Sequence, residues 1–233
     1  MWAKLHNRID LGVLLVFFLG AIGLWAFFGL LDEVSEGDTA RFDKWVLLAF
    51  RSPTDLSIPI GPPALQELMR DATALGGVTI LTLLTLVVAG FLLLQKDRAT
   101  AAFLTASVGS GILASTAFKE LVARPRPDLV PHGSIVSSAS FPSGHSMMAT
   151  LVYLLLAITI ARLQKQMRVK IYVLIVAVML SLGVGISRVY LGVHWPTDVL
   201  AGWSLGAAWA LASWGIALWL EHKHLIPPDQ SQD

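Results

Sequence analysis

Long uncharged apolar runs constrain this chain more than any other feature of its sequence. The first extends from Leu11 to Leu31 without a charge, and about 20 apolar residues are enough for a helix to cross a bilayer. Further apolar runs follow at 75–94, 100–118, 144–161, 171–190 and 196–220, and the last two each contain one charged residue, Arg188 and Asp198. Because a chain in lipid must satisfy its backbone hydrogen bonds internally, we expect an all-α bundle of six transmembrane helices, forming one domain over residues 1–233.

The composition supports a membrane protein and excludes several other classes. Charged residues make up 14% of the chain and hydrophobic residues 55%, whereas soluble domains carry about 25% charged residues. The net charge of +1 gives no reason to expect a nucleic-acid partner. The chain has no cysteine, which excludes disulfides and thiolate chemistry. Lys4 and Arg8 precede the first run as in a signal peptide, but that run exceeds a signal core of about 7–15 residues, so we expect it to be retained as a span.

The polar stretch between the first two runs contains two amphipathic segments. Apolar residues recur at helical spacing at Phe42, Trp45, Val46 and Ala49, and again at Leu65, Leu68, Met69 and Ala72. This spacing predicts two short helices. They either lie at the membrane surface or pack on the bundle, and the sequence favours neither arrangement.

A polar cluster, Phe141-Pro142-Ser143-Gly144-His145, stands at the start of the fourth run. Polar groups at such a position are costly and are usually functional. Backbone N–H groups at the start of a helix bind anions, because they lack intrahelical partners and lie at the positive end of the helix dipole. We therefore expect Ser143 and Gly144 to offer backbone N–H groups to an anion, with His145 beside it.

A six-helix topology brings three polar segments to one face of the membrane. They are the loop after the third span, the start of the fourth span, and the connection between the fifth and sixth spans. Their polar members are Lys119 and Arg126, then Ser143, Gly144 and His145, then Ser187, Arg188, His194 and Asp198. The cations suit a phosphate dianion, because phosphoryl transfer depends mainly on positioning and electrostatic stabilisation.

The spacing of His194 and Asp198 suits a histidine that is oriented by a carboxylate. Pro196 predicts that a helix begins between them, which places Asp198 in the first turn, within reach of the ring. A histidine held in this way can act as a covalent nucleophile. The second histidine, His145, can protonate the leaving alkoxide and then deprotonate the attacking water. This chemistry alone does not decide which histidine attacks.

The remaining histidines and one arginine are expected to lie outside the site. The histidines are His6, His132, His222 and His224. Arg124 is expected to have a surface role, with a reserve phosphate contact as the alternative. The Asp, Glu and His residues show no metal-ligand spacing, so we expect no metal.

The distribution of Lys and Arg predicts the orientation of the chain. Six spans put both termini on one side, together with the turns near 95–99 and 162–170. Once Lys119, Arg126 and Arg188 are assigned to the site, Lys and Arg are more frequent on the side of the termini. The positive-inside rule then places the termini in the cytoplasm and the site on the outer face of the plasma (inner) membrane.

Three motifs carry a resemblance to a known family. They are Lys119-x6-Arg126-Pro127, Pro142-Ser143-Gly144-His145 and Ser187-Arg188-x5-His194-x3-Asp198. Together they resemble the signature of the type 2 phosphatidic acid phosphatase superfamily, whose members are lipid phosphatases without metal or cofactor and share a fold with vanadium-dependent haloperoxidases. The resemblance implies that His194 forms a phosphohistidine, that Asp198 orients it, and that His145 is the general acid. It also implies that phosphate is held by Lys119, Arg126, Ser143, Gly144 and Arg188.

The leading hypothesis is a membrane phosphatase that hydrolyses a lipid phosphomonoester or diphosphate, such as undecaprenyl diphosphate, phosphatidylglycerol phosphate or phosphatidic acid. The lipid tail would stay among the membrane lipids while the head group enters the site. A phosphotransferase that moves the phosphoryl group to another lipid, such as lipid A, could use the same residues. A non-catalytic transporter would leave the spacing of His194 and Asp198 unexplained, and the membrane spans argue against a haloperoxidase. The sequence identifies neither the lipid nor the oligomeric state.

Overall fold

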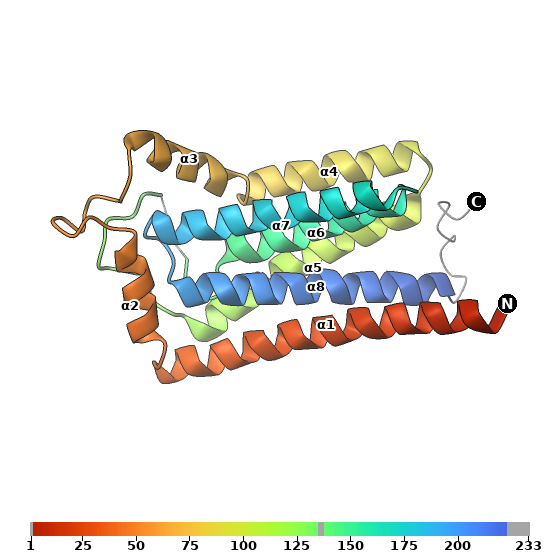
Figure 1. Cartoon of the computed structure of the whole chain (residues 1–233), viewed down its shortest axis with the longest axis horizontal. Helices are drawn as coiled ribbons and strands as arrows, with labels where there is room; N and C mark the ends of the chain where they lie inside the picture. Colours follow the sequence, from red (N-terminus) through yellow and green to blue (C-terminus); the bar gives the residue numbers. More distant parts are fainter. Residues whose placement is uncertain (1, 135–137, 223–233) are drawn as a thin grey trace.

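The computed structural model describes the backbone of residues 2–134 and 138–222, and the side chains of 14–134 and 138–219. Within these ranges the chain is all-α, with one isolated bridge between Arg51 and Pro59 as its extended structure. The helices are α1 (Trp2–Glu36), α2 (Ala40–Ala49), α3 (Pro63–Ala74), α4 (Val78–Leu94), α5 (Arg98–Val122), α6 (Gly144–Arg162), α7 (Met167–Tyr190) and α8 (Pro196–His222). Figure 1 shows them as a bundle of long, roughly aligned helices with α2 and α3 at one end.

The predicted membrane helices are confirmed, with one difference at the second span. Five helices in the described chain, α1 and α5 to α8, are long and apolar enough to cross a bilayer. The second predicted span, 75–94, begins later, as α4, and α4 reaches spanning length only together with α3, from which it is bent by 49°. The bend lies against α7, where a Cβ on Gly76 would come within 2.3 Å of Val184 Cγ1.

The centre of the bundle is α6, which packs against α5, α7 and α8. Of its span, 61% is buried inside the protein, compared with 17% for α1, which packs along α8. Glycines bring α8 unusually close to α6: a Cβ on Gly202 would lie 2.7 Å from the Ser143 carbonyl oxygen, and one on Gly206 would lie 2.4 Å from that of Met147. Small residues permit such close helix contacts in lipid. The contact places the start of α8 beside the start of α6.

The two short helices form as predicted, but α2 does not bury the predicted apolar face. Asp43 and Leu47 are fully buried against the bundle, while Phe42 and Trp45 are 43% and 70% exposed. Asp43 accepts hydrogen bonds from α8 that no aliphatic side chain could accept, and these bonds set the rotation of α2. Helix α3 packs on α7. Of the two expected arrangements, packing on the bundle is observed for both helices, and each also exposes apolar side chains.

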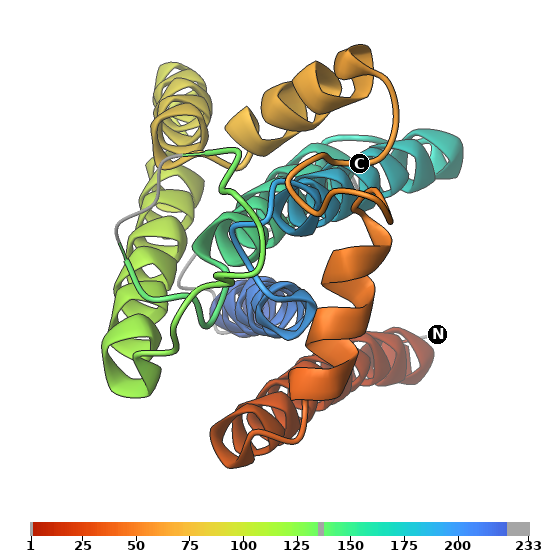
Figure 2. The ribbon, with the colours of Figure 1, turned by 90° about the vertical axis from the view of Figure 1, so that its left-hand side faces the viewer.

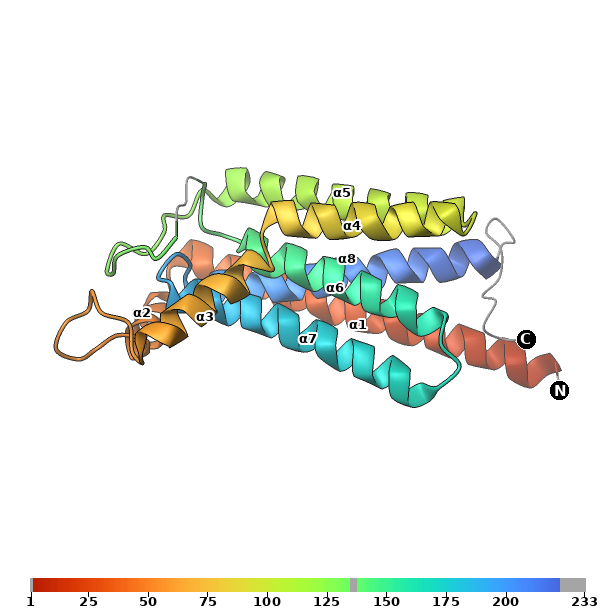
Figure 3. The same cartoon turned by 90° about the horizontal axis from the view of Figure 1, so that it is seen from above.

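The polar connections gather at one end of the bundle. Helix α1 begins and α8 ends at the other end, as Figures 1 and 3 show. The α5–α6 and α7–α8 connections meet at the end that also carries α2 and α3. Figure 2 looks onto this end and shows α2 extending across it from α1 toward the start of α8.

Candidate active site

His194 is held in the turn that joins α7 to α8. Helix α7 ends at Tyr190, and Gly192 follows with φ 72°, a conformation that glycine adopts without strain. A Cβ at this glycine would also lie 2.6 Å from Val130 Cγ2. Pro196 then begins α8, and Asp198 lies in its first turn. The side chains of His194 and Asp198 are 1% and 0% exposed.

The predicted contact between His194 and Asp198 is present. Oδ2 of Asp198 lies 3.4 Å from Nδ1 of His194, and it also accepts hydrogen bonds from the Trp195 backbone N–H at 2.9 Å and from the Ser140 hydroxyl. On the far side of the ring, an Arg126 guanidinium nitrogen lies 3.1 Å from Nε2. Arginine can only donate, so Nε2 carries the lone pair and the proton is on Nδ1, facing the carboxylate.

His194 is neutral in this setting. It lies between two spans, and its complete burial lowers its pKa to about 3, although the hydrogen bond and charge of Asp198 act in the opposite direction. The charges of Arg188 and Arg126 lower the pKa further. A neutral ring with a lone pair on Nε2 is the form that a nucleophilic histidine requires.

Arg126 lies against the Nε2 edge of this ring. Its guanidinium donates to the Val193 carbonyl oxygen at 2.6 Å and to the Ser138 carbonyl oxygen at 2.8 Å, in addition to the contact with His194 Nε2. These bonds leave the planar fork next to the atom that would attack phosphorus. A guanidinium in this place can hold phosphate oxygens in a fixed direction.

Lys119 lies in the last turn of α5, and its predicted place in the following loop is wrong. The third span continues to Val122, because the apolar side chains after residue 118 extend the helix. The Lys119 ammonium donates to the Ala139 carbonyl oxygen at 2.7 Å. A Cβ on Gly144 would lie 3.3 Å from Lys119 Cε, so the glycine at the start of α6 leaves room for the lysine chain.

The expected anion site at the start of α6 needs one correction. The backbone N–H of Ser143 donates to the Asp198 carbonyl oxygen at 2.9 Å, so this group is occupied by the protein itself. The Ser143 side chain caps α6 and accepts hydrogen bonds from the N–H and hydroxyl of Ser146. Gly144 and His145 are the first helical residues, where backbone N–H groups lack intrahelical partners. Any backbone N–H groups available to an anion at this helix start would therefore begin at Gly144.

Arg188 and His145 complete the group of polar residues. Arg188, in the last turn of α7, is 2% exposed and donates to the Thr73 hydroxyl at 2.8 Å. Its Nε has no hydrogen-bond partner in the described chain. His145 is partly buried in the first turn of α6. The structure thus brings the three predicted segments to one end of the bundle.

The expected surface role of Arg124 is wrong. Its side chain is 13% exposed and forms ion pairs with Asp198 at 2.6 Å and with Asp43 at 2.7 Å. Asp43, Ser140 and Thr197 were not predicted from the sequence to belong to the site. The sequence carried no local signal for Asp43, because its burial depends on how α2 rotates against α8.

Of the other histidines, the structure describes only the side chain of His132. His132 is exposed and bonds to the Pro127 carbonyl oxygen at 2.7 Å. The side chains of His6, His222 and His224 lie outside the described residues.

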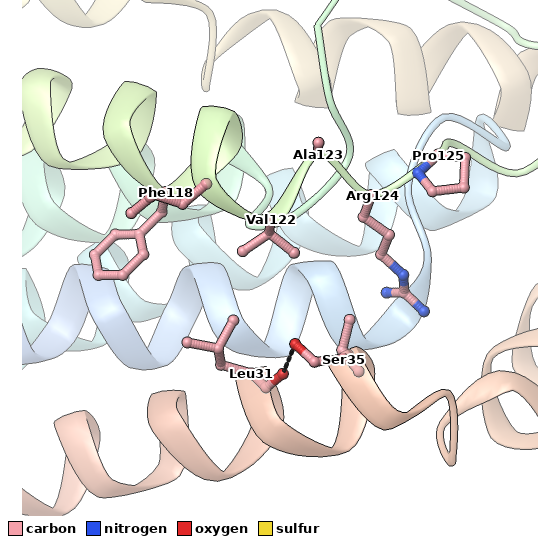
Figure 4. A pocket seen from close by; sticks show the side chains of 9 residues that line it. Leu31, Ser35, Phe118, Val122, Ala123, Arg124 and Pro125 are labelled. Carbon is pink, nitrogen blue, oxygen red and sulfur yellow. Dashed lines mark hydrogen bonds between the residues drawn. The ribbon is translucent and has the colours of Figure 1, made fainter.

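A groove of about 530 Å³ lies beside the site, between α1 and the end of α5. Its lining is apolar apart from Ser35 and Arg124. In Figure 4, Leu31 and Ser35 of α1 face Phe118 and Val122 of α5 across it.

The comparison that decides the family is a match to the sequence model of the PAP2 superfamily, which extends over residues 100–221. The chain belongs to the PAP2 superfamily. This match covers all three motifs and most of the residues that form the site. Membership of this superfamily, together with phosphatase relatives and a transmembrane structural neighbour, shows that the chain is an integral membrane lipid phosphatase.

Relatives and solved structures agree with this membership. Phosphatidylglycerophosphatase B of Bacillus subtilis is 38% identical over 156 residues, which is 64% of this chain and 74% of the relative. A lipid A 1-phosphatase of Rhizobium etli is 27% identical over 71% of this chain and 76% of its own length. The crystal structure of the Bacillus subtilis phosphatidylglycerolphosphate phosphatase superposes with a TM-score of 0.76 and 32% identity, over 86% of this chain and 96% of that one. The crystal structure of Aquifex aeolicus LpxE, with a TM-score of 0.50 and 22% identity, covers 66% of this chain and 87% of that one and supports the fold.

Proposed function

We propose that this PAP2 phosphatase hydrolyses the terminal phosphomonoester of a glycerophospholipid of the phosphatidylglycerophosphate type. The observation that carries the mechanism is the position of the neutral His194 ring, with Asp198 at Nδ1 and Arg126 at Nε2. The substrate class rests on the relative phosphatidylglycerophosphatase B and on the solved structure of a Bacillus subtilis phosphatidylglycerolphosphate phosphatase. We infer that the helical bundle acts as a single domain, because α1 packs along α8 and α6 packs against α5, α7 and α8.

The reaction would proceed in two steps at His194. In the first, Nε2 attacks phosphorus, the P–O bond to the lipid breaks, and His145 gives a proton to the leaving alkoxide. In the second, His145 takes a proton from water, whose oxygen attacks phosphorus and breaks the P–N bond. The products are the lipid alcohol and inorganic phosphate, and both histidines return to their starting forms.

The cations would stabilise the charge that develops on the phosphoryl oxygens. The groups proposed to hold these oxygens are Lys119, Arg126, Arg188, the hydroxyl of Ser143 and the backbone N–H of Gly144. Asp198 would fix the Nδ1 proton and stabilise the imidazolium-like phosphohistidine. All the groups in this mechanism are side chains or backbone N–H groups of the protein, and the mechanism requires no metal ion or cofactor.

Phosphate release from purified protein tests the proposal. Wild type and His194→Ala are compared on phosphatidylglycerophosphate, phosphatidic acid, undecaprenyl diphosphate and a lipid A 1-phosphate, each in detergent without an acceptor lipid. We expect the fastest release from phosphatidylglycerophosphate and none from the variant. Turnover by His194→Ala would refute the nucleophile. Phosphate release that needs an added acceptor lipid would indicate a phosphotransferase, and preference for the lipid A phosphate would favour the function named for the Rhizobium relatives.

We also propose that the site faces the outside of the plasma membrane and that the termini lie in the cytoplasm. The excess of Lys and Arg on the side of the termini supports this orientation. Because the chain contains no cysteine, single cysteines can report the topology. In intact cells, a membrane-impermeant maleimide should label Ser57→Cys, at the exposed site end, and should leave Gln166→Cys unlabelled. The reverse pattern would contradict the orientation.

A further inference from the structure

A second carboxylate, that of Asp43, is linked to Asp198 through Arg124. One guanidinium nitrogen of Arg124, Nη1, lies 2.6 Å from Asp198 Oδ1, and the other, Nη2, lies 2.7 Å from Asp43 Oδ2. The side chains of Asp43 and Asp198 are 1% and 0% exposed, so this bridge is shielded from water. Three buried charges in a row are costly to assemble unless each is paired. The arginine pairs both carboxylates at once.

Thr197 fixes the far end of this bridge. Its backbone N–H donates to Asp43 Oδ1 at 2.9 Å, and its hydroxyl donates to Asp43 Oδ2 at 2.8 Å. Arg124 also donates to the Thr197 hydroxyl at 2.9 Å. Asp43 therefore caps the first turn of α8, although it belongs to α2. The turn that it caps is the turn that carries Asp198.

The bridge divides the two oxygens of Asp198 between different partners. Oδ1 receives Arg124, while Oδ2 is left for Ser140, the Trp195 N–H and the His194 ring. With Oδ1 held, the carboxylate cannot rotate and Oδ2 keeps its direction toward Nδ1. Without Arg124, Oδ1 would be a buried acceptor with no donor, and the carboxylate would turn to find one.

Arg124 is not placed to bind the phosphate itself. Both arms of its guanidinium are occupied by carboxylates, and the group Asp43–Arg124–Asp198 has a net charge of −1. Its exposed part lines the groove between α1 and α5, as Figure 4 shows, whereas Arg126 occupies the Nε2 side of the ring. The bridge contacts Oδ1 of Asp198, which is not the oxygen that faces the His194 ring.

We propose that Asp43 and Arg124 are positioning residues for catalysis, which hold Asp198 in the orientation that keeps the His194 ring ready for attack. This inference rests on the proposed function of His194. It makes the short helix α2 part of the catalytic apparatus, because α2 supplies the carboxylate at the far end of the bridge. The two residues form one unit, and neither touches the substrate.

A double-mutant cycle tests this inference in the full-length protein. The variants are Asp43→Asn, Arg124→Gln and the double variant, measured for kcat, KM and Tm on a short-chain phosphatidic acid in detergent. We expect kcat to fall about 10- to 100-fold in each, as when partners of a functional histidine are removed. KM should stay within about 2-fold of wild type, and the double variant should lose no more than Arg124→Gln, because the pair acts as a unit. The exposed pair Glu67–Arg70 on α3 is the matched control, and Glu67→Gln with Arg70→Gln should leave kcat unchanged.

A conservative variant separates positioning from structural support. Arg124→Lys keeps the positive charge but replaces the planar fork with one ammonium group, which cannot hold two carboxylates in fixed directions. We expect it to restore Tm more completely than kcat. Losses of kcat that follow Tm across all variants, or additive losses in the cycle, would overturn the inference. A rise in KM with unchanged kcat would instead show a substrate contact and would also overturn it.

Failure of this inference can be told apart from failure of the proposed function. Wild type and His194→Ala are measured in the same assay. Turnover by His194→Ala would refute the nucleophile, whatever the cycle shows. An inactive His194→Ala together with Asp43 and Arg124 variants at wild-type kcat would refute only the positioning pair.

Discussion

Nε2 of His194 lies 3.1 Å from a guanidinium nitrogen of Arg126, while Nδ1 of the same ring faces Asp198. The two ring nitrogens thus have different partners, a donor on one side and a carboxylate on the other. This arrangement fixes the tautomer and directs the lone pair of Nε2 toward the cations.

Replacement of Arg126 should reduce catalysis strongly without removing the nucleophile. We expect Arg126→Ala to lower kcat/KM about 10²- to 10³-fold, because one preorganised donor to the phosphoryl oxygens is lost. Arg126→Lys should recover only part of this loss, since an ammonium group lacks the planar fork. The measurement is initial-rate phosphate release. Arg168→Ala, an exposed arginine at the other end of α7, is the control and should behave as wild type. Equal rates for Arg126→Ala and wild type would show that Arg126 does not bind the phosphate.

Acid should destabilise the fold through His194. Burial lowers the pKa of this histidine to about 3, whereas its pKa in the unfolded chain is about 6.5. Between these values the unfolded state binds more protons than the folded state. The free energy of unfolding therefore falls as the pH falls from about 6.5 toward 3, and above about 6.5 this histidine no longer makes it depend on pH. Tm measured across this range checks the prediction.

The matched comparison for the acid effect uses two histidine variants. His194→Gln should flatten the dependence of Tm on pH. His132→Gln, at an exposed position, should leave it as in wild type. An unchanged slope in His194→Gln would show that other groups cause the acid sensitivity.

The sequence predicted the fold and the central residues well, because both depend on local patterns. Uncharged runs predict membrane helices directly, and Pro196 correctly placed Asp198 one turn from His194. The roles of Arg124 and Asp43 could not be predicted in this way. The two residues are separated by 81 positions in the sequence, and their contact depends on how α2 rotates against α8. No local pattern encodes that rotation.

The same limit explains the incorrect prediction for the Ser143 N–H at the start of α6. Helix-start chemistry suggested backbone N–H groups for an anion, but it could not show that the Ser143 N–H would be taken by the Asp198 carbonyl oxygen. That bond exists because Gly202 allows α8 to approach α6 closely. Side-chain partners set by packing between distant helices therefore had to come from the structure.

Chelation should leave activity unchanged. In the described part of the chain, His, Asp and Glu side chains form no group of three or more that could hold a metal ion. Incubation with about 5 mM EDTA followed by desalting should therefore leave kcat within error of the untreated enzyme, because the protein cations supply the stabilisation that metals supply elsewhere. Activity that is lost on chelation and restored by Mg²⁺ or Zn²⁺ would contradict the proposed mechanism.

The close contact between α6 and α8 can be tested with two glycine variants. A Cβ on Gly206 would lie 2.4 Å from the Met147 carbonyl oxygen, a backbone atom that can move only with α6. We expect Gly206→Ala to destabilise the protein by about 1–3 kcal/mol, the usual range for overpacking. Gly183 in α7 is the matched control, since a Cβ there has no neighbour within 4 Å and alanine is the better helix former. Thermal unfolding in detergent should give a lower Tm for Gly206→Ala and an equal or higher Tm for Gly183→Ala. If both variants shift Tm equally, the close approach of α8 to α6 at Gly206 is not what stabilises this contact.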